Sequence, residues 1–163
     1  MTHVDEVEQG QRMAVAEVDP AAYQAVYALE RYLGRSSLEP ALQELIKIRA
    51  SQINGCAFCL DMHQRDARAK GESQRRLDVL IAWHEVAGVF SDRERAALAL
   101  TEAVTRIGDG GVSDQLWGRV RSCFSEQEAA QLIMAIATIN VWNRIAITTR
   151  AQPPTELPAE QPA

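Results

Sequence analysis

Two cysteines and a histidine lie close together in the first half of the chain, at Cys56, Cys59 and His63. If a helix begins near residue 57, Cys59 and His63 lie one turn apart on the same face of it. The whole sequence contains only three cysteines and three histidines. Half of these six side chains lie within eight residues of one another, so we expect the reactive site in this segment.

The position of the cysteine pair at the beginning of a helix favours reactive thiols. A thiol is a nucleophile only as its thiolate, and the free N–H groups and macrodipole of a helix N-terminus stabilise negative charge. In C-x-x-C pairs at such positions the thiol pKa falls from about 8.5 to between about 3.5 and 7.5. The spacing also lets Cys56 and Cys59 close a small disulfide. His63 lies within reach of Cys59 as a base, directly or through a water molecule.

A carboxylate upstream completes a candidate proton relay. Glu44 lies twelve residues before Cys56, and Asn54 and Gly55 interrupt the helical pattern between them. If the helices on either side of this turn pack antiparallel, Glu44 reaches the cysteine region. Two thiols, a histidine and a carboxylate can accept the proton released on thiol activation and return one to a leaving group. The competing interpretation of Glu44 is an ordinary solvated helix residue.

The C-x-x-C pattern alone leaves three interpretations open: redox chemistry, metal binding and an inert structural role. A tetrahedral zinc site needs four ligands, and only His63 and Glu44 are available to join the two cysteines, since no second C-x-x-C occurs. The other candidate residues have simpler roles. We expect Cys123 to be a small core residue, His84 to be structural or interfacial, and His3 to lie in a mobile terminus.

Composition indicates one globular domain. The chain has 163 residues, of which 47% are hydrophobic and 24% charged, with a net charge of −5. This acidic balance argues against nucleic acid as a partner. The longest strongly apolar run, residues 132–137, is far shorter than a membrane span, and the acidic N-terminus is no signal peptide. We therefore expect a cytoplasmic protein without membrane association, in which a cysteine pair favours redox or metal chemistry over a permanent crosslink.

The pattern along the chain predicts an all-α fold. Helices are expected over residues 20–33, 36–53, 56–70, 73–87, 91–107 and 126–149, with a short helix starting at Ser113. Gly55 ends the second of them, and residues 108–111 form a flexible loop. Capping boxes are predicted at Ser36–Glu39, Ser91–Glu94 and Ser125–Glu128. The last helix is apolar on more than one side, which indicates burial in a core or between subunits.

This organisation divides the chain into three parts. We expect an N-terminal segment over residues 1–19, one helical domain over residues 20–149 and a disordered, proline-rich tail over residues 150–163. No strand pattern, internal repeat or linker interrupts the helical part.

The segment from Glu44 to His63 closely resembles the core of the AhpD-like alkylhydroperoxidases of the carboxymuconolactone decarboxylase superfamily. The resemblance continues through residues 82–85, 90–98 and 139–144, in the family's order, and so covers about residues 20–149. It is far more specific than the cysteine pair alone. Decarboxylase members of the superfamily lack this pair, so its presence argues against lactone decarboxylation.

The resemblance implies an all-helical homo-oligomer, often a trimer or hexamer, and a cofactor-free peroxidase that reduces hydroperoxides. Cys59 would be the peroxidatic cysteine and Cys56 the resolving cysteine, with Glu44 and His63 as the proton relay. The reductant would be an external dithiol such as a lipoyl group. No glycine-rich nucleotide fingerprint is present, so direct use of NADH is not expected.

The sequence departs from the peroxidase pattern at Phe58, where the best-known peroxidase of the family has histidine. This change implies a simpler relay or a weaker peroxidase activity. Asn140 and Arg144 match the family too, and we expect them to satisfy backbone groups or to fix a helix or subunit contact. Two rival functions remain: a metal-binding domain using Cys56, Cys59 and His63, and a helical assembly module in which the cysteines sense oxidation without turnover.

Overall fold

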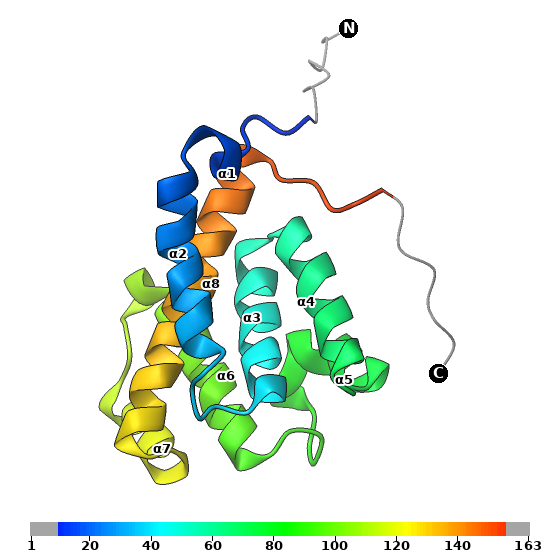
Figure 1. Cartoon of the computed structure of the whole chain (residues 1–163). Coiled ribbons are helices and arrows are strands. Elements are labelled where there is room, and N and C mark those ends of the chain that lie inside the picture. Colours follow the sequence, from blue (N-terminus) through cyan, green and yellow to red (C-terminus); the bar gives the residue numbers. More distant parts are fainter. Residues whose placement is uncertain (1–9, 156–163) are drawn as a thin grey trace, which may run out of the picture.

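The computed structural model describes residues 10–155, and these form helices joined by short loops, with no strand among them (Figure 1). The predicted disorder of residues 156–163 and the predicted mobility around His3 lie outside the described residues. The α-helices are α1 (Val15–Val18), α2 (Pro20–Leu33), α3 (Pro40–Asn54), α4 (Ala57–Ala69), α5 (Gln74–Val79), α6 (Asp92–Thr105), α7 (Asp114–Cys123) and α8 (Glu126–Thr149). Two 3₁₀ helices, η1 (Leu80–Glu85) and η2 (Ile107–Asp109), follow α5 and α6. The prediction of an all-α fold is confirmed.

Helix α3 is the centre of the bundle. It lies between α4 on one side and α8 and α2 on the other, and it also packs against α6 (Figure 1). Every residue from Leu42 to Ser51 is buried. The polar side chains of this helix are buried together with partners from neighbouring segments, as in the ion pair of Lys47 with Glu30 on α2.

Helix α8 combines a buried face with an exposed apolar face. Leu132, Ile136 and Ile139 are fully buried, whereas Ile133, Val141 and Ile147 are 36–44% exposed. By length and composition α8 is the one helix of the described residues that could cross a membrane, a property that core helices of folded bundles share. The apolar run of residues 132–137 did not predict this property, because it covers only a quarter of the helix. In the fold, α8 packs against α2, α3, α6 and α7.

Most predicted helix boundaries are confirmed, and the reasons are local. The capping boxes at Ser91–Glu94 and Ser125–Glu128 are both formed, with side chain and backbone bonded in both directions. The expected capping box at Ser36–Glu39 is wrong. A helix capped at Ser36 would place Pro40 beyond its first turn, where a missing N–H is costly, so α3 begins at Pro40 itself. Ser36 Oγ instead donates to the Leu33 carbonyl at 2.7 Å.

Two other expectations need correction. The helix predicted over residues 73–87 divides into α5 and η1, with non-helical dihedral angles at Ala82. The glycine-rich stretch expected to be a loop is partly ordered by η2, and Gly110 follows it with a φ of 108°. Cys123 is partly buried and packs against the main core, as predicted for a small core residue.

Candidate active site

The cysteine pair lies at the sharp turn between α3 and α4. Gly55 ends α3 in the left-handed conformation, with a φ of 71°, and Cys56 follows as the N-cap of α4. The Cα atoms of Cys56 and Cys59 are 5.4 Å apart, and their sulfur atoms form a disulfide. The backbone N–H of Cys59 donates to the Cys56 sulfur at 3.3 Å, so this sulfur takes the place of a capping oxygen. The pair therefore occupies the positive end of α4.

Helices α3 and α4 pack against each other and bring Glu44 to His63. His63 Nδ1 lies 3.0 Å from Glu44 Oε2, and both residues are buried. Since an ionised carboxylate only accepts hydrogen bonds, Nδ1 carries the proton and Nε2 is left as the basic nitrogen. The geometry expected of antiparallel helices around Asn54 and Gly55 is thus present.

The other oxygen of Glu44 accepts a hydrogen bond from a lysine that the sequence analysis did not predict. Lys70 Nζ donates to Glu44 Oε1 at 2.5 Å. Burial raises the pKa of Glu44, but the hydrogen bonds from His63 and Lys70 and the positive charge of Lys47 outweigh it, so the pKa is lowered. Glu44 is therefore a carboxylate at neutral pH. Lys70 follows His63 by seven residues, two helical turns, and this spacing on α4 is the signal that could have identified it.

A cavity of about 620 Å³ opens beside Cys59 and His63. Its walls come from the segment before α1 and from α1, α2, α3, α4 and α8, and Cys56 is not among its lining residues. Cys59 is thus the cysteine that faces the space where a small molecule can bind. Phe58, at the position where the family's best-known peroxidase has histidine, lines the cavity with an apolar ring.

Asparagines on α8 hold the turn that carries the cysteines. Asn54 Nδ2 donates to Asn140 Oδ1 at 3.0 Å and to Asn143 Oδ1 at 2.9 Å. Asn143 in turn donates to Ser51 Oγ at 3.0 Å, and Arg144 donates to Asn140 Oδ1 at 2.9 Å. The network joins α8 to the end of α3, two residues before Cys56. This arrangement agrees with the structural interpretation of the segment from Asn140 to Arg144.

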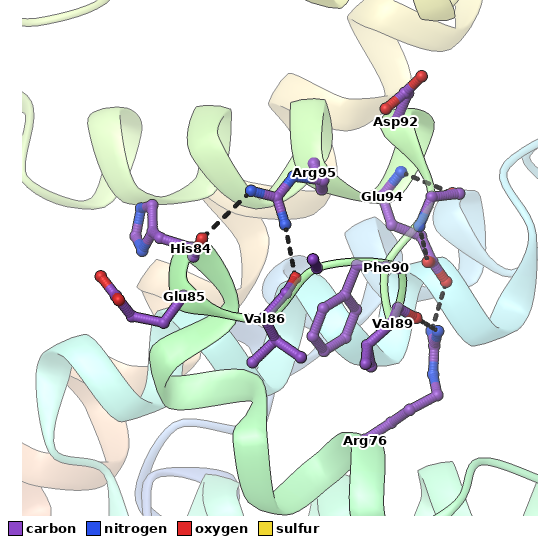
Figure 2. Close-up of a pocket in the computed structure, with 12 residues that line it drawn as sticks. Arg76, His84, Glu85, Val86, Val89, Phe90, Asp92, Glu94 and Arg95 are labelled. Atoms are coloured by element: carbon purple, nitrogen blue, oxygen red, sulfur yellow. Dashed lines mark hydrogen bonds and ion pairs between the residues drawn. The ribbon is translucent and has the colours of Figure 1, made fainter.

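A second cavity, of about 780 Å³, lies between η1 and the beginning of α6 and contains the other family-like segments (Figure 2). Its two arginines are engaged with the surrounding chain: Arg76 bonds Glu94 and the Val89 carbonyl, and Arg95 donates to the carbonyls of Trp83, Val86 and His84. No cysteine lines this cavity. These residues hold the loop after η1, and His84, 53% exposed at its side chain, stacks on Trp83.

The side chains that could hold a metal ion in the structure differ from those that the sequence suggested. Among residues 10–155, the group of side chains arranged closely enough to hold an ion is Glu44, His63 and Asp66, whose ligand atoms lie within 4.8 Å of one another. Both oxygens of Glu44 already accept hydrogen bonds. Neither cysteine belongs to this group, and the disulfide between Cys56 and Cys59 must be reduced before either sulfur can coordinate a metal as a thiolate.

Comparison with known proteins places this chain in a family. The sequence model of the carboxymuconolactone decarboxylase family matches residues 20–103. The uncharacterized protein YdfG of Bacillus subtilis is 44% identical over 137 residues, which are 84% of this chain and 92% of YdfG.

Solved structures agree with this result. A protein of unknown function from Agrobacterium tumefaciens, proposed to be an antioxidant defence protein AhpD, is 41% identical with a TM-score of 0.87 over 90% of this chain and all of its own. The debrominase Bmp8 shares the fold, at 18% identity and a TM-score of 0.76 over 85% of this chain and 74% of its own. The chain therefore belongs to the carboxymuconolactone decarboxylase family, as an AhpD-like member.

Proposed function

We propose that this protein is a thiol-dependent peroxidase that reduces hydroperoxides through Cys59 and Cys56. The observation that carries the proposal is the position of Cys59 in the wall of a cavity, beside a buried histidine that is bonded to a carboxylate. The name of the Agrobacterium relative, which concerns antioxidant defence, agrees with this function.

The first step consumes the peroxide. The Cys59 thiolate attacks the terminal oxygen of R–OOH, the O–O bond breaks, and the leaving alkoxide takes a proton and departs as R–OH. Cys59 is oxidised to a sulfenic acid. His63 accepts the thiol proton at Nε2 and returns it to the leaving oxygen, while Glu44 orients the ring and stabilises its positive charge. Glu44 remains ionised, so it acts as a positioning residue.

The second step closes the disulfide. The Cys56 thiol attacks the sulfenic acid sulfur of Cys59, and water leaves. An external dithiol then reduces the disulfide by exchange, and a lipoyl-type dithiol suits the apolar cavity. A dithiol bound in the cavity attacks the sulfur of Cys59, so Cys56 leaves as the thiolate. Its capping position at α4 stabilises that thiolate, and a better leaving group accelerates exchange.

Homo-oligomerisation is part of the proposal. Ile133, Val141 and Ile147 expose apolar surface on α8, and a second copy of the chain would cover it. The size of the oligomer, for which the family suggests a trimer or hexamer, is tested by light scattering. A cytoplasmic location stays a prediction from composition.

The test is a peroxide-consumption assay with dihydrolipoamide as reductant, run on the Cys123→Ser protein so that only the proposed pair contributes. Catalytic turnover is expected. Oxidation of the pair by peroxide without turnover, with dihydrolipoamide or with any other dithiol supplied, would favour the redox-sensor alternative. Stoichiometric zinc in the purified, reduced protein would favour the metal-binding alternative.

A further inference from the structure

Three aromatic rings form a continuous wall of the cavity beside Cys59. Tyr23 and Tyr27 on α2 stack with ring centroids 6.3 Å apart, and Tyr23 meets Trp142 of α8 at 5.2 Å with its plane tilted by 60°. All three line the cavity, and none is fully buried. Part of their aromatic surface therefore remains uncovered by this chain.

Polar contacts hold this wall in place. The indole N–H of Trp142 donates to Glu30 Oε1 at 3.1 Å, and the other oxygen of Glu30 accepts from Lys47 Nζ at 2.9 Å. Lys47 belongs to the central helix α3, so the chain of contacts joins α8, α2 and α3. Trp142 is therefore held in position by contacts within the protein, which lowers the entropy cost of placing a ligand against it.

The remaining walls are mainly apolar. Met62 and Phe58 of α4 line the cavity together with Ile145 of α8. Met13, in the segment before α1, closes another side, and Arg12 holds that segment by donating from its backbone N–H to the Thr149 carbonyl at 2.8 Å. The cavity has the volume of sites that take drug-sized ligands, far more than hydrogen peroxide fills.

We propose that the preferred substrate is an aryl-substituted alkyl hydroperoxide, whose ring packs against Tyr23, Tyr27 and Trp142 while its peroxide group reaches Cys59 and His63. This inference rests on the proposed function. A saturated group of the same size gains the apolar burial alone, whereas an aromatic ring adds stacked and edge-to-face contacts with the wall. Aromatic character is therefore expected to matter beyond size.

Cumene hydroperoxide serves as the aryl probe. The Cys59 thiolate takes its terminal oxygen, the O–O bond breaks, and with one proton the other product is 2-phenylpropan-2-ol. The size-matched control is p-menthane hydroperoxide, which is saturated, and the small controls are tert-butyl hydroperoxide and hydrogen peroxide. We expect kcat/KM for cumene hydroperoxide to exceed that for p-menthane hydroperoxide about tenfold, equivalent to about 1.4 kcal/mol.

Two variants separate the wall from the rest of α2. Tyr23→Leu removes the ring that contacts both neighbours and should bring the ratio of the two kcat/KM values close to one. Tyr32→Leu, on the same helix but outside the cavity and 46% exposed, should leave the ratio unchanged. Circular dichroism and the melting temperature of each variant establish that it is folded.

Binding is measured separately from turnover. The unreactive product 2-phenylpropan-2-ol should change tryptophan fluorescence of the Cys59→Ser protein, and Trp142→Phe should abolish the change. Alcohol binding without turnover of any peroxide would support the aryl site and reject the peroxidase. Turnover without aryl preference and without alcohol binding would overturn the aryl site alone. Fluorescence changes with oxidised lipoamide but not with the alcohol would assign the cavity to the reductant, and this result would also overturn the aryl site.

Discussion

His63 Nδ1 lies 3.0 Å from Glu44 Oε2, across the interface of α3 and α4, which pack against each other and are joined by the turn at Asn54 and Gly55. The contact is buried, and Lys70 occupies the second oxygen of the same carboxylate. One carboxylate thus fixes the tautomer of the histidine, and the hydrogen bonds from His63 and Lys70 keep it ionised against the effect of burial. This relationship explains how a histidine one turn from Cys59 could serve as a base.

Replacing the carboxylate tests the orientation of His63. Glu44→Gln leaves an amide that can turn its N–H₂ toward the ring and no longer stabilises the imidazolium. We expect peroxide turnover to fall by roughly tenfold or more, since positioned proton transfer contributes about 10²–10⁴. The matched control is Glu102→Gln, which removes another partly buried carboxylate, bonded to Arg49 and Trp83. The control should lose stability and keep its rate; an unaltered rate in Glu44→Gln would remove Glu44 from the site.

Replacing Lys70 tests the charge on Glu44. The hydrogen bond from Lys70 lowers the pKa of Glu44 against the opposing effect of burial. Lys70→Met therefore raises that pKa, so Glu44 becomes protonated at a higher pH and activity is lost earlier on acidification. The measurement is the acid limb of kcat/KM against pH. Lys70→Arg keeps the charge and should restore the wild-type limb; identical profiles for all three proteins would refute the role.

The asparagine network predicts a stability effect at the cysteine turn. Asn54→Ala removes the amide group that donates to Asn140 and Asn143. The buried side-chain oxygen of Asn143 then loses this hydrogen bond. We expect the free energy of unfolding to fall by about 1–3 kcal/mol in urea titrations. Gln24→Ala, an exposed amide on α2, should cost less than about 0.5 kcal/mol. Equal losses in the two variants would contradict a special role for the network.

A surface network predicts the response to acid. Arg93 donates to Glu128 at 2.7 Å, and chiefly for this reason the pKa of Glu128 falls from 4.5 to about 2. A lowered pKa in the folded state adds stability that is present above pH 4.5 and is lost as the pH falls toward 2. Glu128→Gln should therefore be less stable than wild type at pH 7, and the two should converge near pH 2. Parallel curves in urea titrations across this range would contradict the assignment.

The sequence was most informative where structure depends on neighbouring residues. The caps at Ser91 and Ser125 and the turn at Gly55 follow from local chemistry, and the spacing of Cys59 and His63 on one helix does too. The cap at Ser36 failed because Pro40 forced a later helix start. Helical spacing alone identifies Lys70, which lies two turns after His63 on the same face of the helix.

The rest depends on contacts between distant segments. Burial of Lys47 and Arg49 on α3 requires partners from α2 and α6, at Glu30 and Glu102, which no spacing along the chain predicts. The aromatic wall similarly combines Tyr23 with Trp142, more than a hundred residues later, and becomes visible only once α2 and α8 are side by side. The cavity was therefore beyond sequence reasoning, although the reactive residues at its edge were not.

The central claim is that Cys59 is the residue that peroxide oxidises, and single-turnover trapping tests it most directly. The reduced Cys56→Ser, Cys123→Ser protein is treated with one equivalent of hydrogen peroxide and dimedone, and the modified residue is located by mass spectrometry. The account predicts a dimedone adduct on Cys59 and none in the matched Cys59→Ser, Cys123→Ser protein. An adduct on Cys56 in that second protein, with Cys59 unmodified in the first, would contradict it.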